Sequence, residues 1–223
     1  MAVNNKNRIL DERVVYPFLK NIFDKTLALV LLIMCAPVLI SICVLIKISG
    51  MIRKEDRGTI FYLEERSSHG DVFNLIKFRI MKTSVLESLI DEEGRIDRIK
   101  HMEENANNLT HLGCRLKKWY LDEFPQLINI LKGDMSFVGP RPWPRNHYYQ
   151  ELEQGIYRKK VIKNGLTGLV QINKGNYNNL EEEIALDEEY ICKVKEQSQI
   201  KNLFYDISII LKSIIVLLRG RGL

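Results

Sequence analysis

The sequence has few cysteines, and their spacing excludes two common structural classes. The 223 residues contain four, Cys35, Cys43, Cys114 and Cys192, and no two of them form a Cys-x-x-Cys pair. Neither a disulfide framework nor a zinc site is predicted, because both need thiols at short, recurring spacings. We therefore expect a reducing location that faces the cytosol.

Internal repeats and low-complexity linkers are also absent from the sequence, and its length allows one ordinary domain with an appendage. Hydrophobic residues make up 46% and charged residues 27%, a balance that excludes a disordered tail. The formal net charge of +5 favours an acidic partner. Nucleic acid, anionic lipid headgroups and phosphorylated small molecules all meet that requirement.

Charged side chains are missing from one long stretch, residues 26–46, which reads TLALVLLIMCAPVLISICVLI. A continuous helix of that length would span about 30 Å, the thickness of a bilayer core. The length of the run, and the flanking Lys25 and Lys47, favour a membrane helix over a buried helix of a globular protein. A cleaved signal peptide is disfavoured, because no small-residue cleavage pattern follows the run.

The topology of this run depends on Pro37 in its middle. Proline lacks an N–H and disfavours helical geometry at the preceding Ala36, so a kink or break is expected there. Basic residues flank both ends of the run, so the positive-inside tendency does not separate its two sides. We expect a re-entrant helix-break-helix that enters and leaves on the cytosolic face, with a kinked spanning helix as the alternative.

Residues 58–83 have the pattern of a short β-hairpin. Two runs of β-forming residues, 59–62 and 72–75, flank a Ser67-Ser68-His69-Gly70 turn. Lys77 and Arg79 follow the second run and would point the same way if the extended backbone continues. They are either candidate anion ligands or an ordinary solvated strand end.

The chemistry concentrates in residues 121–142, LDEFPQLINILKGDMSFVGPRP. Asp122 and Glu123 stand directly before a predicted helix, since Pro125 is tolerated in a first turn and the apolar residues that follow have helical spacing. A helix start favours an ionised carboxylate and a bound phosphate, although acids there are also ordinary caps. The stiff turn Gly139-Pro140-Arg141-Pro142 is expected to fix the direction of its arginine.

With these segments in order, the chain resembles the bacterial sugar transferase family, the monotopic polyprenyl-phosphate phosphoglycosyl transferases, from about Phe18 to the C-terminus. Four segments carry the resemblance: Lys20-Asn21-Ile22-Phe23-Asp24, Lys77-Phe78-Arg79-Ile80-Met81, the block 121–142, and GLTGLVQIN at 165–173. The smaller members of the family lack an extra N-terminal bundle of membrane helices, and this chain is similar to them. In the family the apolar run is re-entrant, which implies the same topology here.

The resemblance also implies a reaction. The family transfers a sugar phosphate from a UDP-sugar to a polyprenyl phosphate and releases UMP. Asp122 matches the nucleophile, which forms an aspartyl phosphosugar, and Glu123 matches the acid that binds Mg²⁺. A carboxylate that attacks phosphorus divides one transfer into two steps, while Mg²⁺ and cations offset the diphosphate charge. Magnesium keeps several waters, so one carboxylate with substrate oxygens is sufficient.

The expected substrate-binding residues follow from the same resemblance. Lys77, Arg79 and Arg141 match cationic positions that would bind the diphosphate or the lipid phosphate. Lys117 stands where the family often has arginine, which keeps the charge but loses the bidentate fork. Gln171, in the GLTGLVQIN segment, and Asp187 complete the set, with a surface charge as the alternative for Asp187.

The chain departs from the family pattern at a few positions. Ala36 replaces the serine that commonly precedes the membrane proline. Ala106-Asn107-Asn108 replaces an Asp-Pro-Arg before Gly113, and Lys174-Gly175-Asn176 replaces a Gly-Arg. Arginines expected to serve nucleotide or sugar recognition are therefore missing, whereas the acid pair is intact.

These features predict an α+β, predominantly helical fold with a polar leader at 1–15, a re-entrant membrane anchor at 16–50 and a cytosolic catalytic domain at 51–223 that contains helices and a short β-hairpin. The expected location is the cytosolic face of a bacterial inner membrane. The expected role is the first membrane step of a surface glycan, such as exopolysaccharide, capsule, O-antigen or a glycoprotein glycan. The partners would be a UDP-sugar, polyprenyl phosphate, the lipid bilayer, and other assembly enzymes or a second copy, but no nucleic acid. A non-catalytic membrane scaffold for glycan assembly is the alternative.

Overall fold

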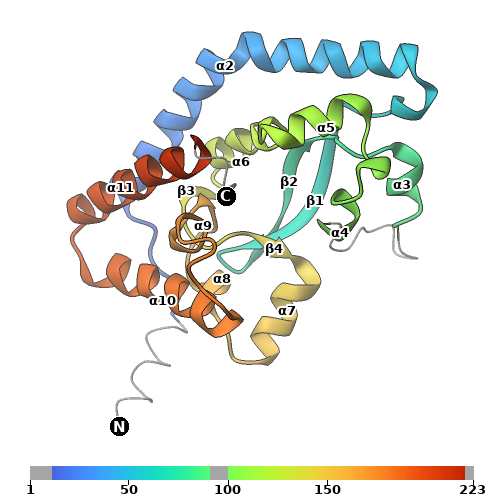
Figure 1. Cartoon of the computed structure of the whole chain (residues 1–223). Helices are drawn as coiled ribbons and strands as arrows, with labels where there is room; N and C mark the ends of the chain where they lie inside the picture. Colours follow the sequence, from blue (N-terminus) through green and yellow to red (C-terminus); the bar gives the residue numbers. More distant parts are fainter. Residues whose placement is uncertain (1–11, 91–99, 219–223) are drawn as a thin grey trace. The chain divides into compact units, whose positions relative to one another are not determined.

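A computed structural model describes residues 12–90 and 100–218 of the chain. It is mostly helical with two small sheets, which confirms the predicted predominance of helix (Figure 1). The chain divides into two compact units, one of residues 1–27, 66–73 and 130–223 and the other of residues 28–65 and 74–129. Most of the polar leader predicted at residues 1–15 lies outside the described residues.

The apolar run lies in α2, Phe18–Ile52, a helix of 35 residues. At about 1.5 Å per residue this helix is long enough to cross a bilayer, and within the described ranges it is the one helix with that length and composition. Ile33, Met34 and Ile40 are 63–71% exposed. The core helix of a soluble protein would bury such side chains, so their exposure favours a membrane environment.

The break expected at Ala36 and Pro37 is not an interruption, because α2 continues as a helix through both residues. Proline cannot donate to the carbonyl one turn earlier, so one hydrogen bond of the helix is missing. The Ser41 hydroxyl donates to the Pro37 carbonyl oxygen at 2.8 Å. The predicted helix-break-helix is thus corrected to one continuous helix, which Figure 1 draws as a single ribbon. The re-entrant topology and the domain boundaries at 15 and 50 remain predictions.

The unit of residues 28–65 and 74–129 is organised around one apolar core. Ile42 and Ile46 of α2 pack there with Phe78, Met81 and Leu116. One face of α2 is therefore covered by protein. The other helices of this unit are η1 (Lys54–Asp56), α3 (Thr83–Glu87), α4 (Lys100–Glu103), η2 (Ala106–Asn108), α5 (His111–Lys118) and η3 (Leu121–Glu123), and α6 (Gln126–Lys132) begins in it.

The predicted hairpin is present and is longer than expected. Its strands are β1, Phe61–Ser68, and β2, Asp71–Phe78. The two turn residues, His69 and Gly70, have φ values of 54° and 87°, as a tight two-residue hairpin turn requires. β4 (Trp143–Pro144) pairs antiparallel with β1 and gives a sheet of order β2-β1-β4.

The unit of residues 1–27, 66–73 and 130–223 combines a parallel strand pair with the C-terminal helices. β3 (Ser136–Val138) pairs with β5 (Gly165–Thr167), and the helices α9 and α11 pack on one another. Val138, Tyr190, Ile191 and Ile209 are among its fully buried side chains. The helices of this unit are α7 (Arg145–Glu153), α8 (Arg158–Val161), α9 (Leu169–Ile172), α10 (Leu180–Glu196) and α11 (Gln199–Leu218).

Gly113 provides a test of the packing between α5 and the strand end. Alanine in place of glycine inside a helix normally stabilises it by about 1 kcal/mol. Here an added Cβ would lie 2.1 Å from the Ile80 carbonyl oxygen, and overpacking against backbone costs roughly 1–3 kcal/mol or more. Gly113→Ala should therefore lower the thermal unfolding midpoint in detergent by several degrees. His111→Ala, at an exposed position of the same helix, should leave it nearly unchanged, and an unchanged midpoint for Gly113→Ala would contradict the close packing.

Candidate active site

The Asp122-Glu123 pair stands where the chain turns from α5 towards α6. α5 ends at Lys118, and Tyr120 has a left-handed backbone conformation with φ 54° and ψ 21°. This conformation is uncommon for a residue other than glycine, and it redirects the chain after a helix. The acids follow on η3, and α6 begins at Gln126. The acid pair therefore directly precedes a helix, as the sequence predicted.

The carboxyl group of Asp122 is buried. The residue is 6% exposed, and Oδ1 has no hydrogen-bond partner among the described residues. Burial, followed by the neighbouring Glu123 carboxylate, raises the pKa of Asp122 to about 6, while Lys77 opposes the shift. A buried carboxylate with one oxygen unpaired is costly to ionise and is incompletely stabilised once ionised. That property suits a nucleophile.

Glu123 and its neighbours form a charged cluster around Asp122. Lys77 Nζ, near the end of β2, lies 4.0 Å from Glu123 Oε1, and both side chains are largely buried. Burial raises the pKa of Glu103, and the ammonium groups of Lys77 and Lys117 lower it. Lys117 Nζ also donates to the Glu103 carbonyl oxygen at 2.5 Å. The structure thus brings four predicted site residues together with Glu103, a residue that no sequence motif singled out.

Arg79 is held by protein groups. Its Nε donates to the Thr59 carbonyl oxygen at 2.8 Å, Nη1 to that of Met81 at 2.6 Å and Nη2 to that of Asp56 at 2.6 Å. The residue is 2% exposed. β2 ends at Phe78, so Arg79 does not continue the strand that carries Lys77. We interpret Arg79 as the residue that fixes the segments around the end of β2.

The acid pair fits the donor set of Mg²⁺. In the described ranges no three His, Cys, Asp or Glu side chains are arranged to hold a metal. Magnesium does not need such a cage, because it keeps several waters and takes one or two carboxylates with substrate phosphates. Glu123 would hold the ion, with the unpaired Asp122 Oδ1 beside it.

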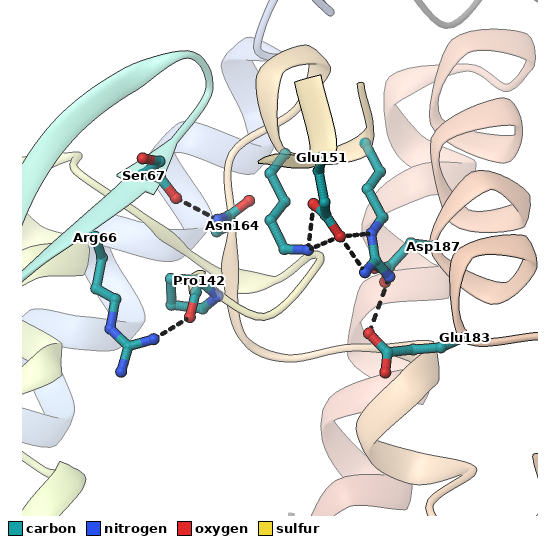
Figure 2. A network of polar contacts seen from close by, with 9 residues as sticks. Arg66, Ser67, Pro142, Glu151, Asn164, Glu183 and Asp187 are labelled. Carbon is teal, nitrogen blue, oxygen red and sulfur yellow. Dashed lines mark hydrogen bonds and ion pairs between the residues drawn. The ribbon is translucent and has the colours of Figure 1, made fainter. Parts of the chain in front are cut away.

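Arg141 belongs to the other unit, on the turn that follows β3. The Gly139 N–H donates to the Thr167 carbonyl oxygen at 2.9 Å. Arg66 Nη1 donates to the Pro142 carbonyl oxygen at 3.1 Å, as Figure 2 shows. The turn is therefore held on both sides of Arg141, as its proline and glycine content predicted.

Asp187 is part of a buried charge network. It is 2% exposed and accepts a hydrogen bond of 2.8 Å from Arg158 Nη1 (Figure 2). The same guanidinium donates to Glu183 and Glu151, and Lys159 Nζ donates to Glu151 at 2.8 Å. Burial raises the pKa of Asp187 to about 6 against the effect of Arg158. The alternative that Asp187 is a surface charge is therefore wrong.

Gln171 is the third predicted site residue of this unit. It is 3% exposed, and neither of its amide atoms has a hydrogen-bond partner in the described part of the chain. An unsatisfied buried polar group costs about 1–3 kcal/mol, so such an amide usually has bound water or a ligand as partner. Gln171 is a candidate ligand contact.

Comparison with known proteins defines the class. The sequence pattern of the bacterial sugar transferase family matches residues 15–220. The chain belongs to this family and is therefore a sugar transferase.

Three relatives illustrate the match. The chain is 33% identical over 216 residues to the exopolysaccharide production protein ExoY of Rhizobium meliloti, and the aligned stretch covers 91% of this chain and 87% of that protein. It is 31% identical over 197 residues to the UDP-glucose:undecaprenyl-phosphate glucose-1-phosphate transferase of Escherichia coli, covering 85% and 39%. It is 32% identical over 214 residues to the undecaprenyl-phosphate galactose phosphotransferase of Salmonella typhimurium, covering 92% and 41%. The chain thus spans most of the first relative and about two fifths of the other two.

The pKa of Asp122 leads to a test that does not depend on activity. The pKa in the folded protein, about 6, lies above the ordinary value of 3.8, so the ionised carboxylate opposes folding above pH 6 and the effect disappears below about pH 4. Asp122→Asn should therefore raise the free energy of unfolding at pH 8 by about 2–3 kcal/mol and leave it unchanged at pH 4. Unfolding of the purified protein in detergent at both pH values measures the difference.

The matched control is Asp71→Asn on the hairpin, where the side chain is 76% exposed. It should have little effect at either pH. An equal effect of Asp122→Asn at pH 4 and pH 8 would show that the pKa of Asp122 is not raised.

Proposed function

We propose that this protein transfers a sugar 1-phosphate from a UDP-sugar to a membrane polyprenyl phosphate and releases UMP. The E. coli and Salmonella relatives, a glucose-1-phosphate transferase and a galactose phosphotransferase that use undecaprenyl phosphate by name, support this reaction class. The observation that carries the proposal to this chain is the buried Asp122 carboxyl group with an unpaired Oδ1, beside Glu123 and Lys77.

The reaction would proceed in two displacements at one phosphorus. An oxygen of Asp122 attacks the phosphorus that bears the sugar, the bond to the bridging oxygen breaks, and UMP leaves with the electron pair. An aspartyl phosphosugar remains on the enzyme. An oxygen of polyprenyl phosphate then attacks the same phosphorus, the Asp122 carboxylate leaves, and the product is a sugar on polyprenyl diphosphate.

The neighbouring residues would stabilise the charge that these steps concentrate. Mg²⁺ held at Glu123 would offset the negative charge of the diphosphate. Lys77 and Lys117 would add positive charge next to the nucleophile, and Arg141 and Gln171 would contact the substrates. Because Arg79 and Asp187 are held by protein partners, we assign them a supporting role.

The second substrate is a lipid, which requires a site at a membrane. We propose that α2 anchors the protein at the cytosolic face of a bacterial inner membrane and enters and leaves on that face. Basic residues lie in the polar segments on both sides of the apolar run. This symmetry supports the topology, because the positive-inside tendency would keep both ends on the cytosolic face. The product would begin a surface glycan, such as exopolysaccharide, capsule, O-antigen or a glycoprotein glycan, with other assembly enzymes or a second copy as partners.

Release of UMP tests the reaction. Purified protein with Mg²⁺, undecaprenyl phosphate and a panel of UDP-sugars should release UMP from at least one sugar nucleotide, and EDTA should stop the release. Asp122→Asn should lower the rate by three orders of magnitude or more, roughly as removal of a covalent nucleophile does elsewhere. Mass spectrometry of protein quenched with the UDP-sugar alone should find the phosphosugar on Asp122.

Asp71→Asn serves as the control and should keep the parent rate. A parent-like rate in Asp122→Asn would exclude Asp122 as the nucleophile. Failure to release UMP from any sugar nucleotide would favour the non-catalytic scaffold instead.

Cysteine accessibility tests the membrane topology. Val15 and Met51 lie on either side of the apolar run and are 91% and 81% exposed. Single cysteines at these positions, in a background without the native cysteines, should both react with an impermeant maleimide in inside-out vesicles and stay unlabelled in right-side-out vesicles. Labelling of the two positions from opposite sides would establish a spanning helix.

A further inference from the structure

The segment Lys20–Asp24 has no role in the proposed reaction, and the structure gives it unusual surroundings. It forms the first turns of α2, before the apolar run. Lys20 and Asp24 are only 1% and 2% exposed. Lys20 Nζ lies 2.5 Å from Asp206 Oδ2 on α11 and 3.9 Å from Asp24 Oδ2. A membrane helix thus begins with charged side chains that are buried in protein.

Hydroxyl groups complete this cluster. Ser136 Oγ, on β3, donates to Asp24 Oδ2 at 2.7 Å, and the Tyr16 hydroxyl donates to the same oxygen. The Tyr190 hydroxyl donates to Asp206 Oδ1 at 2.8 Å. Burial raises the pKa of both tyrosines well above the ordinary value, so both stay protonated donors. We call these six residues the foot cluster; they are Tyr16, Lys20, Asp24, Ser136, Tyr190 and Asp206.

The foot cluster is directly connected to the arginine turn. All six residues belong to the unit that contains Arg141. Ser136 is the first residue of β3, β3 ends at Val138, and the turn that carries Arg141 begins at the next residue. The Tyr190 hydroxyl also lies 3.2 Å from the Val138 carbonyl oxygen. Both ends of this three-residue strand therefore contact the foot cluster.

We propose that the foot cluster is a positioning device that holds the arginine turn at a fixed place relative to the start of the membrane helix. This inference rests on the proposed function, in which Arg141 contacts a phosphate and one phosphate belongs to a lipid whose depth the bilayer sets. Lys20, Asp24 and Ser136 are then positioning residues, not catalytic ones.

The composition of the cluster supports this role over simple stabilisation. Replacing a buried ion pair by apolar residues of similar size is often neutral for stability or increases it. Apolar packing is non-directional, however, whereas charge-assisted hydrogen bonds fix both distance and angle. An ionic cluster is therefore the better device where orientation, rather than stability, is required.

The first experiment removes the bond between Asp24 and β3. Ser136→Ala should lower kcat/KM for UMP release about tenfold or more, because small displacements of a substrate contact are costly. It should also lower the unfolding midpoint, because Asp24 Oδ2 and the Val138 N–H each lose a buried partner. The decisive readout is a double-mutant cycle with Arg141→Ala. If Ser136 acts through Arg141, Ser136→Ala has no further effect on kcat/KM once Arg141→Ala is present. Ser208→Ala, which removes a local hydroxyl bond to the Tyr205 carbonyl oxygen in α11, is the matched control.

The second experiment replaces the ion pair as a unit. Lys20→Met with Asp206→Leu should lower kcat/KM and accelerate amide hydrogen exchange of residues 136–139. The exposed pair Lys193–Glu189, 2.6 Å apart on α10, gives the control double variant Lys193→Met with Glu189→Leu, which should change neither property.

The outcomes separate this inference from the proposed function. Additive effects of Ser136→Ala and Arg141→Ala, or parent-like exchange of residues 136–139 in the apolar double variant, would overturn the positioning role. If the parent itself releases no UMP, the proposed function fails, and hydrogen exchange still decides whether the foot cluster holds the turn. If the apolar double variant does not fold, exchange in Ser136→Ala decides the same point.

Discussion

The desolvation of the Asp122 carboxyl group is the constraint on which the proposed chemistry depends. Two other buried charges have close partners of opposite sign: Lys20 contacts Asp206, and Arg158 contacts Asp187. At Asp122 no described residue donates to Oδ1, and the pKa rises to about 6. The cost of an uncompensated buried charge is several kcal/mol in general, and a protein retains such a cost where the group must react.

Different faces of α2 lie in different environments. Ile42 and Ile46 pack in the core with Phe78 and Leu116, while Ile33 and Ile40 remain exposed. Because both protein core and lipid accept apolar side chains, hydropathy identifies the whole helix but not the face that each environment covers. The environment of the first turns of α2 is clear from their charged residues. Lys20 and Asp24 are stable only where protein partners surround them, so these turns lie against protein.

Features set by neighbouring residues could be predicted from the sequence, and features set by distant ones could not. The hairpin, α2 and the acid pair before α6 follow from local periodicity, turn residues and Pro125. Lys77 and Arg79 were expected to act together, but β2 ends between them at Phe78 and Arg79 is bound by carbonyls from other segments. The Lys20–Asp206 pair joins residues 186 positions apart, a contact that no local pattern encodes.

The charge around the acid pair connects its two proposed roles. Asp122, Glu123 and Glu103 provide three carboxyl groups against the ammonium groups of Lys77 and Lys117, a formal excess of one negative charge when all are ionised. That excess contributes to the raised pKa of Asp122. A divalent cation held at Glu123 would reverse the sign and lower the pKa of Asp122. The proposed nucleophile would then be more readily ionised with the metal bound, and without the metal it would stay largely protonated below about pH 6.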